Sequence, residues 1–232
     1  GGQGMLGSIA RISWTYVFMF ILFGAFLVKS GAGDFIIELA RCAAGRFVGG
    51  PGFVAVFASG LMGSVSGSSV ANTVSTGVIT IPLMRKSGFP ARFAAGVEAA
   101  ASTGGQLMPP VMGAGAFIMA SYTQVSYLTI VAVAALPALL YFLSVAMFVR
   151  IEAKRSHAVK LEDEETPRLA TVLKGGWHFL LPLVVLVAAL VYGFTPTYAA
   201  GIAIVSVILA SWLSGRPMGV RDIVEALAMG AR

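Results

Sequence analysis

Residues 53–84, FVAVFASGLMGSVSGSSVANTVSTGVITIPLM, decide the fold of this chain. The stretch carries no charged residue, but its middle, residues 63–77, is too rich in glycine, serine and threonine for a plain lipid-facing helix. Backbone groups at membrane depth must be hydrogen-bonded internally, and non-helical backbone survives there only against protein or a cavity. The stretch therefore predicts two half-helices with a bend between them.

The composition places the rest of the chain in a membrane as well. Of its 232 residues, 57% are hydrophobic and 11% are charged, whereas a soluble domain carries about 25% charged residues. The net charge of +6 comes from basic residues clustered between apolar runs. That placement follows the positive-inside bias and argues against nucleic-acid binding. Because Cys42 is the only cysteine, an internal disulfide and a cysteine-based metal cluster are excluded.

The flanks of the polar stretch indicate its topology. Arg46 precedes it, and Arg85 and Lys86 follow it, so the positive-inside bias puts both ends on the same side. We therefore expect a re-entrant helical hairpin over residues 51–90.

Other apolar runs predict an all-α polytopic membrane protein. Residues 1–50 should hold a first span, Ile12–Val28, and an interfacial helix over 34–47. Residues 91–150 should hold a broken transmembrane helix, Ala91–Met119, and a return span, Tyr127–Val149. We expect a cytoplasmic loop over 151–176, which largely coincides with a charged connector from Arg150 to Lys174 that has an acidic centre at Glu162–Glu165. Residues 177–232 should add spans at Trp177–Tyr192 and Pro196–Leu213 and an amphipathic stretch from Arg221.

Hydroxyl and amide side chains gather at the bend of the hairpin. Ser66, Ser69, Thr73 and Thr76 recur at helical spacing, with Ser68, Asn72 and Ser75 on the adjacent face. An oxygen-only site without carboxylates suits a weakly held hard monovalent cation, and unwound carbonyls beside half-helix ends form such sites in transporters. This pattern predicts a sodium site. Close helix packing is the alternative reading of so many small residues.

A second polar cluster lies in residues 97–117, VEAAASTGGQLMPPVMGAGAF. Glu98, Ser102 and Gln106 fall on one helical face, and glycines and prolines interrupt the helix at Gly104, Gly105, Pro109 and Pro110. A carboxylate at a helix centre costs about 2.5–3.5 kcal/mol on insertion scales, which favours a functional role for Glu98. An interfacial ion pair with the nearby Arg92 remains open as the other interpretation.

An enzymatic reading has less support. Ser66 and Gly67 resemble the serine of an intramembrane protease, but such a serine needs a general base. His157 falls in the charged connector and His178 at a helix start, and neither is expected at the depth of Ser66. We therefore predict no enzyme.

In these motifs the chain resembles the large membrane subunit of the tripartite ATP-independent periplasmic (TRAP) transporters. The resemblance rests on residues 23–35 (FGAFLVKSGAGDF), 45–51 (GRFVGGP) and the two long polar stretches, and it extends over about 4–143. Within the family, it is most similar to the fused permease that serves TAXI-type binding proteins. We expect both ends of this sequence to be internal points of such a permease.

The resemblance implies half of an elevator-type transporter in the bacterial inner membrane, with two inverted repeats of which only the first is complete here. A periplasmic TAXI-type binding protein would deliver a small organic acid, and the small-subunit region of the same permease would precede this segment. Sodium would be the coupling ion, and no other cofactor is expected. The alternatives are proton coupling through Glu98, or a channel or scaffold subunit. The implied cation and substrate residues are Ser66, Gly67, Ser68, Ser69, Asn72, Thr73, Ser102, Thr103, Gly104, Gly105 and Pro109, with sodium held by Ser66, Ser69, Asn72 and Ser102.

Overall fold

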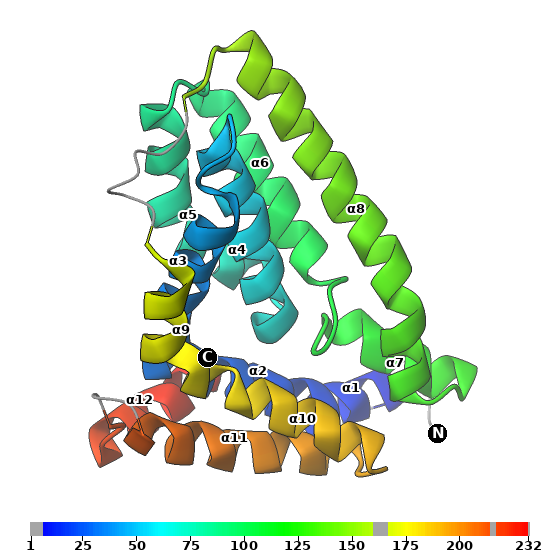
Figure 1. Cartoon of the computed structure of the whole chain (residues 1–232). Coiled ribbons are helices and arrows are strands. Elements are labelled where there is room, and N and C mark those ends of the chain that lie inside the picture. Colours follow the sequence, from blue (N-terminus) through cyan, green and yellow to red (C-terminus); the bar gives the residue numbers. More distant parts are fainter. Residues whose placement is uncertain (1–6, 160–166, 214–216, 232) are drawn as a thin grey trace.

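A computed structural model describes residues 7–159, 167–213 and 217–231. Within these ranges the regular structure is helical and no strand occurs. The helices form two groups (Figure 1). Helices α1, α2, α10, α11 and α12 form a layer at the foot of the view, and α3, α4, α5 and α6 stand above it with the long α8 leaning along one side.

The first span and the predicted interfacial helix run on from one another. Helices α1 (Ser8–Ile12), α2 (Phe18–Leu27) and α3 (Gly33–Ala44) are joined by π-helical turns at 13–17 and 28–32. Gly31 in the second turn has φ of 98° and lies outside the helical region, so the chain is kinked between α2 and α3, close to where the sequence predicts that the span ends and the next helix begins. A residue with a Cβ disfavours that conformation, and glycine permits the kink.

The predicted bend in the hairpin is confirmed. Helix α4 (Gly50–Ser66) ends at Gly67, which has φ of 62°, and α5 (Ser69–Lys86) starts after the extended Ser68. The side chain of Ser68 accepts a hydrogen bond from the backbone N–H of Ala71 and so caps α5. The glycine ends one helix and the serine starts the next, so a single unbroken helix over 53–84 is excluded.

The second break is also where the sequence predicts it. Helix α6 (Ala91–Gly105) and α7 (Ala114–Thr123) are separated by residues 106–113, which contain a cis Pro109–Pro110 bond. Helix α8 (Tyr127–Arg155) then extends six residues past the predicted end at Val149. Its last turn carries Lys154 and Arg155, and basic side chains stabilise a helix C-terminus.

The charged connector is shorter than expected. Arg150 still belongs to α8, and Lys174 lies in α9 (Leu169–Gly176), while the acidic stretch Glu162–Glu165 lies outside the described residues.

The predicted span Trp177–Tyr192 is wrong as a single straight helix. A 3₁₀ turn over Trp177–Phe179 precedes α10 (Leu181–Val191), and the segments on either side of Leu180 are bent by 53°. Pro182 at the start of α10 explains the bend, because proline cannot donate the backbone hydrogen bond that would continue the preceding turn. Helix α11 (Pro196–Leu213) and the amphipathic α12 (Val220–Gly230) follow, close to their predicted ranges.

Within the part of the chain that the structure describes, two helical runs are long and apolar enough to cross a membrane, Ala10–Ala44 and Tyr127–Arg155, and the bent pair around Leu180 would make a third. Shorter apolar helices cover Gly50–Ser66 and Pro196–Trp212. Helix α4 has 17 residues, which is at the lower end of the length range of a spanning helix.

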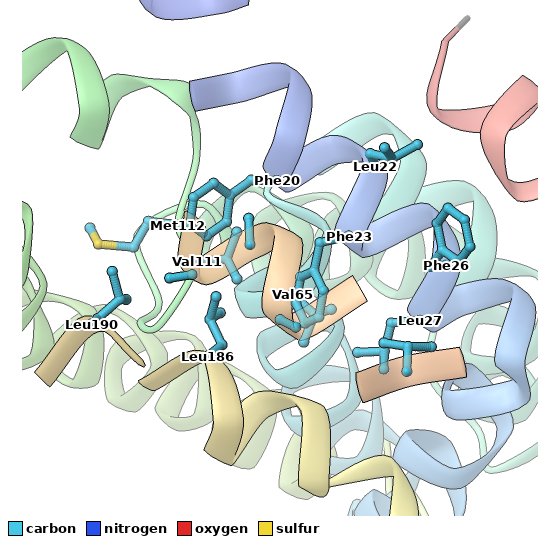
Figure 2. Close-up of a cluster of buried hydrophobic side chains, with 14 of the residues drawn as sticks. Phe20, Leu22, Phe23, Phe26, Leu27, Val65, Val111, Met112, Leu186 and Leu190 are labelled. Atoms are coloured by element: carbon cyan, nitrogen blue, oxygen red, sulfur yellow. The ribbon is translucent and has the colours of Figure 1, made fainter. Parts of the chain in front are cut away.

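The largest apolar cluster joins the two groups of helices (Figure 2). Phe23 and Leu27 of α2 and Leu186 of α10 pack together with Val65 at the end of α4 and Val111 in the second break. Both breaks are thus held against the layer formed by α2 and α10.

Candidate functional site

The two breaks lie against each other. The backbone N–H of Val111 donates to the carbonyl oxygen of Ser64 at 3.1 Å. A Cβ built on Gly67 would lie only 2.4 Å from the carbonyl oxygen of Met112, and Gly113 is also in contact with Gly67. Because glycine supplies both the positive φ and this close approach, Gly67 fixes how the hairpin tip meets the second break.

Below the tip, α4 and α6 cross at two glycines. A Cβ on Gly63 would lie 2.4 Å from the Cα of Gly105, and one on Gly105 would lie 2.6 Å from the Cα of Gly63. The side-chain nitrogen of Asn72 sits at this crossing and donates to the carbonyl oxygen of Ser59 at 2.7 Å. The small residues therefore let the two backbones approach and leave room for one amide side chain.

Glu98 is the centre of the polar cluster. Its side chain is fully buried, and hydroxyl groups from three helices surround the carboxyl group. Ser59 of α4 donates to Oε1 at 2.8 Å and Ser102 of α6 donates to the same oxygen at 3.1 Å. From α5, Thr76 donates to Oε1 and Thr80 to Oε2, each at 2.5 Å. We call Glu98 with these four hydroxyl residues the carboxyl cluster.

The carboxyl cluster contradicts the interfacial ion pair that the sequence left open for Glu98. Arg92 is exposed, and the ion pairs among the described residues involve Lys29, Arg221, Asp222 and Glu225. Burial of Glu98 without a cationic partner is costly unless hydrogen bonds compensate or the group is neutral. The hydroxyls supply those hydrogen bonds.

Asn72 holds the one acceptor of this region that lacks a partner in the described structure. Its side chain is fully buried, and its Oδ1 has no hydrogen-bond donor. The amide orientation is fixed by chemistry, because flipping it would bring Oδ1 against the carbonyl oxygen of Ser59. A buried oxygen of this kind needs a water, a cation or a ligand.

The buried polar residues of α5 differ in part from the set that the sequence predicts. Asn72, Thr76 and Thr80 are fully buried, whereas Ser69 and Thr73 are half-buried. Ser66, Gly67 and Ser68 are half-buried at the tip, and within the described residues the hydroxyl of Ser66 forms hydrogen bonds only with the backbone of Ser68, at 3.5 Å. The three buried and the two half-buried residues named first all belong to α5, so the difference comes from how this helix is rotated against α4 and α6.

Of the proposed sodium ligands, Asn72 and Ser102 therefore belong with the carboxyl cluster, and Ser66 and Ser69 lie at the tip.

The remaining predicted residues of α6 have separate surroundings. Thr103 is exposed and donates to the carbonyl oxygen of Ala99. Gly104 faces α8, where a Cβ would meet the ring of Tyr141 at 2.2 Å. Pro109 lies in the break, and the buried hydroxyl of Tyr127 lies within hydrogen-bond distance of the next two carbonyl oxygens, those of Pro110 and Val111, to either of which it can donate.

A groove of about 550 Å³ borders the second break on its other side. Gln106 and Gly113 form its edge, and apolar side chains of α7 and α8 make up most of its lining. Such a lining suits lipid tails or another apolar helix better than a carboxylate.

Sequence reasoning missed Ser59 and Thr80. Asn72, Thr76 and Thr80 follow one another at intervals of four residues, so the sequence alone predicts that all three lie on one face of a helix. Ser59 lies 39 residues before Glu98 in an apolar run, and only the crossing of α4 and α6 brings it to the carboxyl group.

The amino-acid sequence matches a known family over nearly its whole length. The profile of the DctM component of the tripartite ATP-independent periplasmic transporters matches residues 2–232. The chain belongs to this family. It is 34% identical over 189 residues to a C4-dicarboxylate TRAP transporter large permease protein of Pseudomonas aeruginosa, which covers 80% of the chain and 43% of that protein.

Further TRAP relatives bear names for other substrates. A sialic acid TRAP transporter large permease protein of Vibrio cholerae is 28% identical over 202 residues, 87% of the chain and 47% of the relative. A 2,3-diketo-L-gulonate TRAP transporter large permease protein of Escherichia coli is 26% identical over 202 residues, with the same coverage of 87% and 47%. The chain thus spans about half the length of the curated relatives it matches, and these relatives are transporter permeases, not enzymes.

Proposed function

We propose that this chain is the hairpin-bearing half of a secondary transporter that takes up a small organic acid with sodium as the coupling ion. The observation that carries the proposal is the buried, unpartnered Oδ1 of Asn72 where α4, α5 and α6 meet. Sodium is a hard cation that takes neutral oxygens from side chains and unwound backbone, and the two adjoining breaks supply such backbone. Ser66, Ser69 and Ser102 are the further ligands we assign to it.

The substrate class rests on the relatives. Their names specify a C4-dicarboxylate, sialic acid and 2,3-diketo-L-gulonate, all of which carry a carboxylate. We assign a small organic acid to the space around the hairpin tip and Ser102–Gly105. Backbone N–H groups at half-helix starts, such as that of α5, favour an anionic group.

The working assembly is larger than this chain. We assign it to the bacterial inner membrane, with a periplasmic TAXI-type binding protein that delivers the acid and a small-subunit region in the same permease. The carboxyl cluster ties α4, α5 and α6 together. This supports an elevator in which the re-entrant hairpin and the broken helix move as one body against α2 and α10.

The test uses the full-length permease in proteoliposomes together with its binding protein. An inward sodium gradient should drive uptake of the acid, and Asn72→Ala should lose that dependence. The matched control is Ser144→Ala, an exposed serine of α8 whose hydroxyl bonds only within its own helix. Sodium-independent uptake by the unmodified permease would refute sodium coupling, and wild-type uptake by Asn72→Ala would refute the site.

Proton coupling through Glu98 is the second candidate, and the burial of this carboxyl group among hydroxyls favours it. It predicts uptake driven by a pH gradient alone and lost in Glu98→Gln. A channel or scaffold subunit would instead give no saturable uptake that depends on the binding protein.

A further inference from the structure

A second cavity lies between the helical run Ala10–Ala44 and the segment that leads into α10. It has a volume of about 540 Å³. Its wall comes from residues 30–38 and 167–179, where α3 and α9 lie side by side (Figure 1). Among the described residues, its lining shares no member with the hairpin, the second break or the carboxyl cluster. Its chemistry therefore needs an explanation of its own.

The α3 side of the cavity is acidic. Asp34 and Glu38 are four residues apart on this helix, so both carboxylates lie on the face that borders the cavity. Both residues are exposed, and neither has an ion-pair partner within the described ranges. Lys29, five residues before Asp34, pairs instead with Asp222 and Glu225 of α12. The cavity thus offers two carboxylates to a cation from outside the described chain.

The opposite side holds a buried histidine. His178 lines the cavity from the 3₁₀ turn that follows α9. Only 4% of this residue is exposed, and its Nε2 has no hydrogen-bond partner in the described structure. Buried polar atoms are normally satisfied by protein, water or a ligand. Because Nε2 accepts a hydrogen bond when the ring proton is on Nδ1, a ligand with N–H groups would satisfy it.

The rest of the lining adds a hydroxyl oxygen and an aromatic wall. The Ser30 hydroxyl donates to the carbonyl oxygen of Leu27 at 2.7 Å, which leaves lone pairs of the Ser30 oxygen free to accept. The ring centroids of Phe35 and Phe179 lie 5.7 Å apart, and ring faces of this kind attract cations. A Cβ on Gly176 would overlap the ring of Phe35, so glycine lets this ring pack directly on α9.

These features select one kind of cation. Within the part of the chain that the structure describes, no three His, Cys, Asp or Glu side chains are placed to hold a metal ion. A quaternary ammonium has no N–H group and is bound by an aromatic cage, whereas this lining has more acceptors than rings. A primary ammonium has three N–H donors, and they match Asp34, Glu38 and Nε2 of His178.

We propose that this cavity binds a primary ammonium group, which Asp34 and Glu38 attract and which donates a hydrogen bond to Nε2 of His178. Two sources carry such a group: the headgroup of an ethanolamine phospholipid and a soluble amine. In either case the ammonium joins α3 to the turn after α9, and so the first long helical run to the start of the bent pair. The site is separate from Asn72 and goes beyond the proposed transport of an organic acid.

The test is calorimetric titration of the delipidated full-length permease with dihexanoyl phosphatidylethanolamine and with ethanolamine. Saturable binding of ethanolamine supports a site for soluble amines, and binding of the phospholipid alone supports a site for a lipid headgroup. Dihexanoyl phosphatidylcholine has methyl groups in place of the N–H donors, so it should bind about tenfold more weakly or not at all. Binding of neither amine probe, or equal affinity for the choline lipid, would overturn the proposal.

Charge-removing variants test the assigned residues. Glu38→Gln and Asp34→Asn keep the shape of an exposed side chain and remove a charged acceptor, so each should weaken binding of the amine probe about tenfold. The matched control is Glu152→Gln, which removes a carboxylate of α8 that does not line the cavity and should leave the affinity unchanged. His178→Phe keeps a ring and removes Nε2, and it should weaken binding as well. Unmodified affinity in either Glu38→Gln or Asp34→Asn would refute the assignment.

Discussion

Replacing Gly63 by alanine should separate α4 from α6 at the crossing that holds the site together. The added Cβ would lie 2.4 Å from the Cα of Gly105, whereas ordinary contact begins at 3.4 Å, so this distance must grow by 1.0 Å to restore ordinary contact. The same Cβ would lie 2.9 Å from the side-chain nitrogen of Asn72. Relief by side-chain rotation is unavailable at the first contact, because Gly105 presents backbone there.

The cost follows from two effects. Overpacking by one methyl group costs about 1–3 kcal/mol in a packed interior. Displacing Asn72 from Ser59 removes a buried hydrogen bond worth about 0.5–1.5 kcal/mol. Alanine gains up to about 1 kcal/mol of helix propensity over glycine within α4, so we expect Gly63→Ala to lower the free energy of unfolding by about 1–3 kcal/mol.

The assay is unfolding of the full-length permease in mixed micelles, with Gly96→Ala as the matched control. Gly96 lies in α6, and a Cβ there would meet nothing within 4 Å. Alanine is the better helix former by up to about 1 kcal/mol, so the control should be neutral or stabilised. Equal stability of the Gly63→Ala and Gly96→Ala variants would refute the close crossing.

Three further predictions concern the tip, the second break and α12. Gly67→Ala should destabilise the permease and abolish uptake, because alanine is strained at φ of 62° and its Cβ would meet the carbonyl oxygen of Met112. Its control is Gly193→Ala, where φ is 88° but the space around the added Cβ is open, so this variant should lose only the backbone-strain energy, about 1–2 kcal/mol, in the same unfolding assay. Tyr127→Phe should cost about 1–3 kcal/mol by leaving the carbonyl groups of Pro110 and Val111 without their buried donor, while the exposed Tyr122→Phe should be silent. Hydrogen bonds from Lys29 and then from Arg221 lower the pKa of Glu225. The docking of α12 therefore gains stability above the ordinary carboxyl pKa and loses it as pH falls through the lowered value. Hydrogen exchange of residues 220–230, corrected for its intrinsic pH dependence, should become faster in acid and in Glu225→Gln at neutral pH, and an exchange rate that is the same under all these conditions would contradict the pairing.

The sequence predicts the hairpin well because local chemistry determines it. Gly67 and Ser68 end one helix and cap the next, and no distant contact is needed to see why the chain bends there. The break at 106–113 is equally local, since it follows two glycines and contains two prolines.

The carboxyl cluster is predictable only in part. Glu98 and Ser102 are one helical turn apart, and burial of a lone carboxyl group is visible as an anomaly in an apolar run. Its partner Ser59 depends on the angle at which α4 crosses α6, which periodicity does not contain. The buried face of α5 depends on how the helix is rotated against its neighbours, which buries Asn72 and Thr80 and leaves Ser69 and Thr73 only half-buried.

The bend at the start of α10, in the helical layer beneath the site, is harder to predict from a local sequence pattern. The run from Trp177 to Tyr192 is apolar throughout apart from its histidine and reads as one span, but Pro182 and the close contact of Gly176 with the ring of Phe35 bend it. That contact joins residues far apart in the chain, so a window of sequence does not reveal it.

Sodium binding to the purified full-length permease tests the central claim most directly. In calorimetric titrations with potassium as the control ion, the unmodified protein and Ser144→Ala should bind sodium saturably, and Asn72→Ala should not. Equal sodium affinity in Asn72→Ala, or no sodium binding by the unmodified permease, would contradict the assignment of the unpartnered Oδ1 of Asn72 as a cation ligand.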